Sequence, residues 1–218
     1  MMKKFLILKL EGPMQAWGGH TFEDYRPSEI FPTRSGVVGL IGGCLGIDRN
    51  DSRRLTDLSV SFFFAARCDN TPFQVYKLTD FHTVMNARRV GGSDGKFPVV
   101  SRREYLCDAC FTLALEVLDD APFSIEDVAR AVRHPYYTPF LGRRCCPLGR
   151  PLYEDEVLAS DLLAALKRIP PFSGTVYCEN LKSMNRMVVR DVPMPGASRR
   201  FATREVYIHQ QEVEDVSE

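Results

Sequence analysis

The sequence lacks several features that mark broad classes of protein. No apolar run reaches the roughly 18 residues that a membrane-spanning helix needs, although 44% of the residues are hydrophobic. Acidic and basic residues balance to a formal net charge of zero, which argues against a general polyanion-binding protein. It has no internal repeat and no low-complexity tract. We therefore expect a soluble folded chain, because 218 residues suffice for a core of its own.

A convincing export signal is also missing. The first residues, MMKKFLILKLEG, carry lysines and an apolar stretch, but no small-residue cleavage site follows and Lys9 interrupts the run. A first strand over residues 3–11 is the better interpretation. Seven cysteines, an odd number in a chain too large to need disulfides, favour a reducing cytoplasmic location.

The sequence also has few cysteine pairs with the spacing of zinc ligands. Cys107 and Cys110 form one C-x-x-C, but the other close pair, Cys145 and Cys146, is adjacent and unsuited to zinc. No pair among the four histidines has a spacing typical of metal ligands. The sequence therefore predicts no metal site and no cofactor.

Arginine, in contrast, is abundant. There are 21 arginines against seven lysines, with Arg-Arg doublets at 53–54, 88–89, 102–103, 143–144 and 199–200. Arginine suits forked contacts with phosphate and stacking on bases. The doublets therefore favour an anionic ligand over an ordinary solvated surface.

Hydrophobic periodicity predicts both strands and helices. Strand patterns cover, in order, residues 3–11, 59–68, 73–81, 103–118, 174–179, 185–191 and 201–210. One helix is predicted in the glycine-rich stretch from about residue 35. A second runs from a Ser124 cap to Pro135, and a short third follows a Ser160 cap.

This order of elements is an α+β pattern. It is compatible with a ferredoxin-like core, which RNA-recognition modules also use. Long excursions interrupt that core, and a basic, glycine-tipped one at about residues 82–103 suggests a protruding hairpin. Additional C-terminal strands lead to a short acidic tail at about 211–218. We expect one domain over residues 1–218.

The stretch FPTRSGVVGLIGG, residues 31–43, has the composition of an anion-binding turn. It lacks the lysine of a P-loop and the preceding strand of a dinucleotide site. Either the helix N-terminus near Ser35 holds a phosphate with Thr33 and Arg34, or Thr33 or Ser35 only caps the helix, and the two roles can also coexist. Its glycines leave one side of the helix bare, which predicts close approach to a sheet.

Several blocks along the chain together resemble a known family. The blocks are GPMQAWG (12–18), RP (26–27), FPTRSGVVGLIGGCLGI (31–47), DFHTV (80–84), REYLCDA (103–109), YTPFLGRRCCPL (137–148) and FATREVY (201–207). In this order they are similar to Cas5 subunits of type I-E Cascade, a bacterial CRISPR surveillance complex. The resemblance implies a repeat-associated (RAMP), RRM-like fold with a protruding β-hairpin called the thumb.

The resemblance also implies a function and partners. Such subunits bind the repeat-derived 5′ handle of the CRISPR RNA (crRNA) and cap one end of the complex. They contact the backbone subunit and the large subunit that recognises the protospacer-adjacent motif, so target DNA is engaged indirectly and no membrane is involved. The expected RNA-binding residues are Met14, Gln15, Trp17, Arg26, Thr33, Arg34, Ser35, His82, Arg88, Arg89, Arg102, Arg103, Tyr105, Tyr137, Arg143, Arg144 and Arg204.

The types of these residues suit single-stranded RNA. Arginines contact the backbone, and aromatic side chains stack on unstacked bases. Trp17, between Ala16 and two glycines, is expected to stack on a base, and Gln15 could read a base edge because its amide both donates and accepts.

Two other functions stay open from the residues. Tyr76, Lys77 and His82 could act as a metal-independent endoribonuclease that processes precursor crRNA. Strand parity places Lys77 on the opposite face from the other two, so we expect no catalytic residues. A purely structural adaptor is the second alternative, and it predicts that the arginines mainly pair with protein carboxylates.

Overall fold

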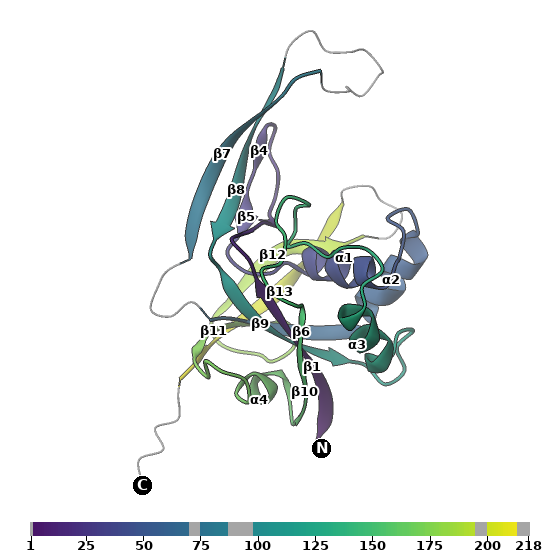
Figure 1. The fold of residues 1–218 in the computed structure, drawn as a ribbon. Coiled ribbons are helices and arrows are strands. Elements are labelled where there is room, and N and C mark those ends of the chain that lie inside the picture. The colour runs from purple at the N-terminus through teal and green to yellow at the C-terminus, as the bar shows by residue number, and fades with distance from the viewer. Residues whose placement is uncertain (1, 70–74, 87–97, 195–199, 213–218) are drawn as a thin grey trace.

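The computed structural model describes residues 2–69, 75–86, 98–194 and 200–212. These residues form a large antiparallel sheet, helices on its two faces and a long hairpin that extends away from it (Figure 1). The elements are β1 (Lys3–Glu11), β2 (Met14–Gln15), β3 (Trp17–Gly18), β4 (Tyr25–Arg26), β5 (Ser28–Glu29), α1 (Arg34–Cys44), α2 (Ser52–Val60), β6 (Phe62–Cys68), β7 (Tyr76–Val84), β8 (Val99–Cys107), β9 (Cys110–Val117), α3 (Ile125–Arg133), β10 (Tyr153–Ala159), α4 (Leu162–Leu166), β11 (Gly174–Cys178), β12 (Arg186–Pro193) and β13 (Phe201–Gln211).

Four strands of the large sheet form a ferredoxin-like core. The strand order is β10-β1-β9-β6-β11-β13-β12, and all neighbouring pairs are antiparallel. Its first four strands are the fourth, first, third and second of a βαββαβ unit, in which α1 and α2 follow β1 and α3 follows β9. The last three extend the sheet beyond β6. The predicted α+β class, ferredoxin-like core and additional C-terminal strands are confirmed.

The apolar run of β1 reflects a sheet that is covered on both faces. Leu6, Leu8 and Leu10 join the main core with α1 and α3, whereas Phe5 and Ile7 join a second core under α4. RNA-recognition modules stack bases on an open sheet face. Here α4 packs on that face against β6, β9 and β10, so this part of the sheet is not open for base stacking.

A buried ion network explains the lysine that interrupts the β1 run. Lys9 Nζ lies 2.8 Å from Asp69 Oδ2, and Asp69 Oδ1 accepts from Arg67 Nε at 2.7 Å. The fully buried Arg67 guanidinium also donates to Thr112 Oγ1 and to two main-chain carbonyls at the end of α4. A buried charge needs such partners, so Lys9 fits a strand of the core.

The hairpin is built from β7 and β8. Their pairing runs from Tyr76 opposite Cys107 to Val84 opposite Val99 without a register shift. The strands therefore extend beyond the predicted 82–103 at both ends, and the hairpin leaves the body of the molecule (Figure 1). β8 also pairs with β2 and β4, which fixes its base.

Several local predictions need correction. Residues 59 and 60 end α2, a polar helix absent from the prediction, so the strand expected at 59–68 begins at Phe62. The expected strand 103–118 is two strands, because the chain turns at Asp108 with φ of 50°. Asp161, not Ser160, caps α4, accepting from the Ala164 amide at 2.8 Å, and β10 is a further strand the prediction missed.

Candidate nucleic-acid interface

The first turn of α1 already holds an anion from the protein itself. Thr33 is the N-cap, and its Oγ1 accepts from the Gly36 amide at 3.3 Å. The Arg34 amide donates to Asp191 Oδ2 at 2.7 Å. An internal carboxylate therefore occupies the place that a phosphate would take at this helix N-terminus. Of the two alternatives, the structure shows capping.

The Arg34 side chain points into the protein, not toward a ligand. Its guanidinium contacts Glu179 at 2.5 Å, and Glu179 also contacts Arg204 at 3.2 Å. Arg204 in turn forms two hydrogen bonds of 2.7 Å to Asp191. We call these four residues the buried ring. The predictions of Arg34 and Arg204 as RNA contacts do not fit, because both arginines have internal carboxylates and little exposure.

Trp17 and Gln15 are core residues as well, which corrects the predicted stacking and base reading. Both are completely buried. The Gln15 amide donates to the main-chain oxygens of Leu10 (3.0 Å) and Ala109 (2.5 Å) and accepts from Trp17 Nε1 at 3.0 Å. A Cβ at Gly36 would lie 2.7 Å from the Trp17 ring, so this glycine makes room for the indole. Thr33 is also buried; it caps α1, and it borders a cleft beside that helix.

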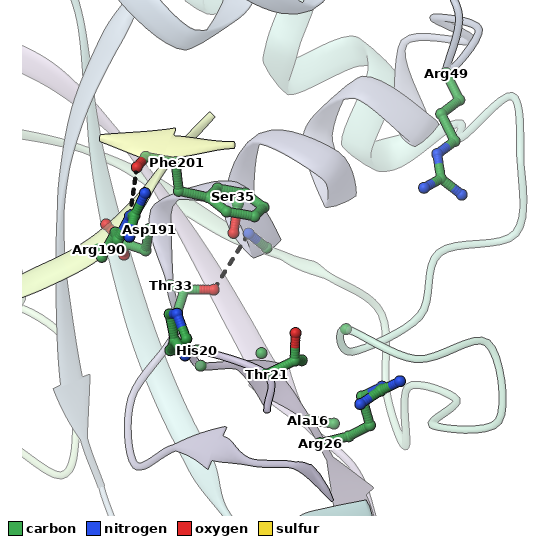
Figure 2. A pocket seen from close by; sticks show the side chains of 14 residues that line it. Ala16, His20, Thr21, Arg26, Thr33, Ser35, Arg49, Arg190, Asp191 and Phe201 are labelled. Atoms are coloured by element: carbon green, nitrogen blue, oxygen red, sulfur yellow. Dashed lines mark hydrogen bonds between the residues drawn. The ribbon is translucent and has the colours of Figure 1, made fainter. Parts of the chain in front are cut away.

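A cleft of about 760 Å³ opens beside the first turn of α1 (Figure 2). Arg26 from β4, Arg49 from the loop after α1 and Arg190 from β12 line it. Arg26 and Arg190 donate to main-chain carbonyls, and within the described part of the chain none of the three pairs with a carboxylate. The half-buried Ser35, one of the predicted RNA-binding residues, also lines the cleft. Arg49 and Arg190 carry no motif that would have singled them out.

A tightly held loop forms one side of this cleft. Arg143 donates to the carbonyls of Glu104 (2.8 Å) and Arg26 (2.9 Å) and stacks on the Tyr105 ring at 4.5 Å. Gly142 has φ of 84°, and a Cβ there would lie 1.7 Å from the Ala16 carbonyl oxygen. Arg143 and the buried Tyr105 thus fix the loop, which corrects the prediction of Tyr105 as a base platform.

The remaining predicted residues lie on or near the surface. Arg144 is exposed at the turn of this loop, Tyr137 lies half exposed earlier in it, and Met14 is half-buried in β2. Arg88 and Arg89 fall in the range 87–97, outside the described residues.

The hairpin carries a second group of predicted residues. Arg102 pairs with Asp24 at 3.1 Å and lies 5.8 Å from the exposed Phe81 ring. Arg103 donates to Ser101, and His82 Nδ1 is a buried atom without a hydrogen-bond partner in the described structure. Arg102 and Arg103 pair with Tyr25 and Arg26 of β4, so they lie on the part of the hairpin next to the strand that brings Arg26 to the cleft.

The proposed nuclease residues do not converge. The regular register of β7 keeps Tyr76 and His82 on one face, and six residues of strand separate them by about 20 Å. Lys77 Nζ lies on the other face and donates to the Ser28 carbonyl and to Glu104. This arrangement lacks the common reaction centre that acid–base cleavage needs.

Glu104 joins the base of the hairpin to β4 and β5. Its carboxylate accepts from Tyr25, from the Ser28 amide at 3.0 Å and from Lys77 at 3.1 Å. Burial opposes ionisation of Glu104, but these hydrogen bonds outweigh it and hold its pKa below the usual value.

The described residues offer no metal site. They contain no cluster of three or more His, Cys, Asp or Glu suited to a metal ion, and none of the seven cysteines, all of which the structure describes, forms a disulfide. Burial is the main cause that raises the pKa of Cys44 and Cys110 to about 11 and that of Cys146 to about 12.

Among the described helices, none is long and apolar enough to span a membrane.

Fold and cleft together define a ferredoxin-like protein with an added hairpin and an arginine-lined surface. A family model described as "CRISPR-associated protein (Cas_Cas5)" matches residues 5–207. The "CRISPR system Cascade subunit CasD" of Escherichia coli (strain K12) is 45% identical over 215 residues, covering 95% of this chain and 96% of the relative. The chain belongs to the Cas5 family of CRISPR-associated proteins.

Solved structures agree with this assignment. A chain of a "CRISPR RNA-guided surveillance complex" superposes with a TM-score of 0.77 at 28% identity, over 96% of this chain and 90% of that one. A second, titled "Crystal structure of Cas protein", gives a TM-score of 0.68 at 27% identity, over 95% and 94%.

Proposed function

We propose that this chain is a non-catalytic subunit of a type I-E Cascade complex and binds the 5′ handle of its crRNA. The observation that carries the binding role is the cleft, which Arg26, Arg49 and Arg190 line from three separate segments without carboxylate partners in the described structure. Because no carboxylate neutralises them, these arginines keep their positive charge for an anion, and the phosphates of RNA are an anion that suits them. The near identity in length with the CasD relative supports membership of the complex.

The same proposal assigns the partners. The hairpin, with exposed Tyr76, Phe81 and Met85, has the apolar surface of an interface and would contact the backbone subunit. The other end of the molecule would cap the filament, near the large subunit that recognises the protospacer-adjacent motif. Target DNA would be reached only through the assembled complex, in the cytoplasm, as part of antiviral defence. The chain acts as one domain with its thumb.

RNA titration tests the proposal. Purified full-length protein is titrated with its own repeat RNA, intact and without the 5′ handle, at several salt concentrations. We expect handle-dependent binding that weakens with salt by about 0.7 log units per log unit of salt for each phosphate neutralised. Equal binding of both RNAs would contradict the handle-binding role and favour the structural adaptor.

The same samples on a denaturing gel test the absence of catalysis. We expect intact RNA, because Tyr76, Lys77 and His82 do not meet at one point. Shortened RNA that disappears with His82→Ala would establish an endoribonuclease instead.

Charge-removing variants connect the binding to the cleft. Replacing Arg26, Arg49 and Arg190 together by glutamine should abolish the preference for the handle while leaving the fold intact. Arg168→Gln is the matched control, because Arg168 is also an exposed arginine but follows α4 on the other face of the sheet (Figure 1).

A further inference from the structure

A second groove continues from the cleft along the exposed side of α1. It encloses about 430 Å³ between α1 and the loop 137–142. Ser35, Gly36, Arg49 and Gly142 line both hollows, so the groove and the cleft are continuous. A chain that occupies the cleft can therefore place a side group in the groove.

The floor of the groove is helix backbone. A Cβ added at Gly39 or Gly43 would meet nothing within 4 Å, whereas one at Gly42 would contact Leu55 at 3.2 Å. Glycine weakens a helix relative to alanine, and packing within this chain does not explain it at 39 and 43. The bare side of α1 thus faces an open groove here, and not the sheet as the sequence predicted.

Aromatic side chains line the opposite wall. Tyr137 and Phe140 are 48% and 40% exposed. Main-chain hydrogen bonds hold their loop near both ends, from Tyr137 N to Gly43 O at 3.2 Å and from Ala16 N to Leu141 O at 3.0 Å. The groove is therefore preformed, with a flat floor and an apolar wall.

Charge distinguishes the two ends of the groove. Arg49 stands where the groove meets the cleft, and Figure 2 shows its side chain reaching from the loop toward the opening. No carboxylate partner of Arg49 occurs in the described ranges. Asp48 is the one acidic residue in the lining, and its Oδ1 accepts from the Asn50 amide at 2.8 Å.

We propose that the groove holds one unstacked base of the RNA whose backbone passes through the cleft, with the adjoining phosphate at Arg49. The inference rests on the proposed handle binding and adds a base site to it. A planar ring fits between a backbone floor and an aromatic wall, since stacking on an aromatic side chain accepts any base. Arg49 lines both the groove and the cleft, so a phosphate bound there would adjoin a base held in the groove.

The test is an abasic scan of the 5′ handle, one nucleotide at a time, with the full-length protein. We expect one position at which loss of the base weakens binding about 10-fold in the wild type. Gly39→Gln should fill the groove and reduce affinity for intact handle to a similar extent. In this variant the same abasic RNA should bind no worse than intact RNA.

The melting temperature of Gly39→Gln is the control for its folding. Because a Cβ at 39 would meet nothing within 4 Å and glutamine favours helix, Gly39→Gln should melt at the same temperature as the wild type or higher. Weaker RNA binding by an equally stable chain would separate the groove from the fold. Arg168→Gln should behave as the wild type with every RNA.

Three outcomes would overturn the base site. Equal losses at all abasic positions would show that no single base is held, although handle-dependent binding by the wild type would still support the proposed function. Unchanged RNA affinity of Gly39→Gln, with impaired assembly with the other Cascade subunits, would assign the groove to a protein partner. Absence of any handle preference in the wild type would overturn both proposals.

Discussion

The arginines inside the molecule and those of the cleft have opposite surroundings. Arg34, Arg67 and Arg204 are buried or nearly so, and each contacts carboxylates of the chain. Arg26 and Arg49, only a few residues from α1, have no such partner among the described residues. An arginine taken out of water needs a compensating charge, while an exposed one keeps its charge for a ligand. The presence of a carboxylate partner, and not the number of arginines, therefore distinguishes a structural arginine from one that can bind a ligand.

The two sets also depend on each other. Asp191 lines the cleft, yet Arg204 neutralises it and the Arg34 amide binds it. Without this pairing, a carboxylate next to Arg190 would repel a phosphate. The buried ring thus fixes α1 and neutralises a negative charge at the cleft.

The largest effect on stability is expected at the most buried arginine. Arg67→Met removes one of the two cations paired with Asp69 and leaves the Leu166 and Ile169 carbonyls without the guanidinium donor. Breaking a buried ion pair typically costs about 3–5 kcal/mol, so the free energy of unfolding in urea should fall by that amount. Arg168→Gln should change it by less than about 0.5 kcal/mol. Equal effects of the two variants would remove the distinction between buried and exposed arginines.

A smaller loss is expected in the loop that borders both the cleft and the groove, where Gly142 lines each of them. Gly142→Ala introduces a Cβ beside the Ala16 carbonyl at a φ of 84°. We expect a loss of about 1–3 kcal/mol and weaker binding of handle RNA, because the loop must move. Gly149→Ala is the matched control, since its Cβ would meet nothing closer than 3.5 Å. If Gly142→Ala changed neither the stability nor the binding of handle RNA, the loop would not shape the site.

Glu104 should stabilise the hairpin in a pH-dependent way. Its pKa is lower in the folded chain, so its contribution is present above the unfolded pKa and is lost as the pH falls through the folded pKa. Glu104→Gln should therefore destabilise the chain by about 1 kcal/mol at pH 7, and the difference from the wild type should shrink below pH 4. Unfolding curves at several pH values measure it. A difference independent of pH would assign the loss to packing.

The smallest expected effect is that bound RNA protects the loop beside Arg144 from chemical labelling. Cys145 is exposed, whereas Cys146 is buried and its pKa is raised to about 12, chiefly by burial. A maleimide should modify Cys145 first, and bound handle RNA should slow this several-fold. An unchanged rate with saturating RNA would place Arg144 outside the RNA surface. Mass spectrometry of the labelled peptide reads the result.

Local patterns in the sequence predict the framework of this fold well. The continuous apolar run of β1, the Ser124 cap of α3 and the order of elements all act over a few residues, and the structure confirms them. The helix α2 was missed because its polar sequence contributes mainly Leu58 to the core.

The site is harder to predict because its partners are distant in sequence. Arg34 meets Glu179 and Asp191, which lie 145 and 157 positions away. Trp17 looks like a loop residue until Gly36 and Gln15 are brought against it. Nothing near Arg49 or Arg190 in the chain signals that they share a cleft.

Salt dependence of handle binding tests the central claim most directly. The slope of log affinity against log salt is measured for the wild type, for the variant with Arg26, Arg49 and Arg190 changed to glutamine, and for Arg168→Gln. If the three cleft arginines each neutralise a phosphate, the slope of the triple variant should be shallower by about 2, while Arg168→Gln matches the wild type. Parallel slopes for all three proteins would contradict the claim that this cleft binds the RNA backbone.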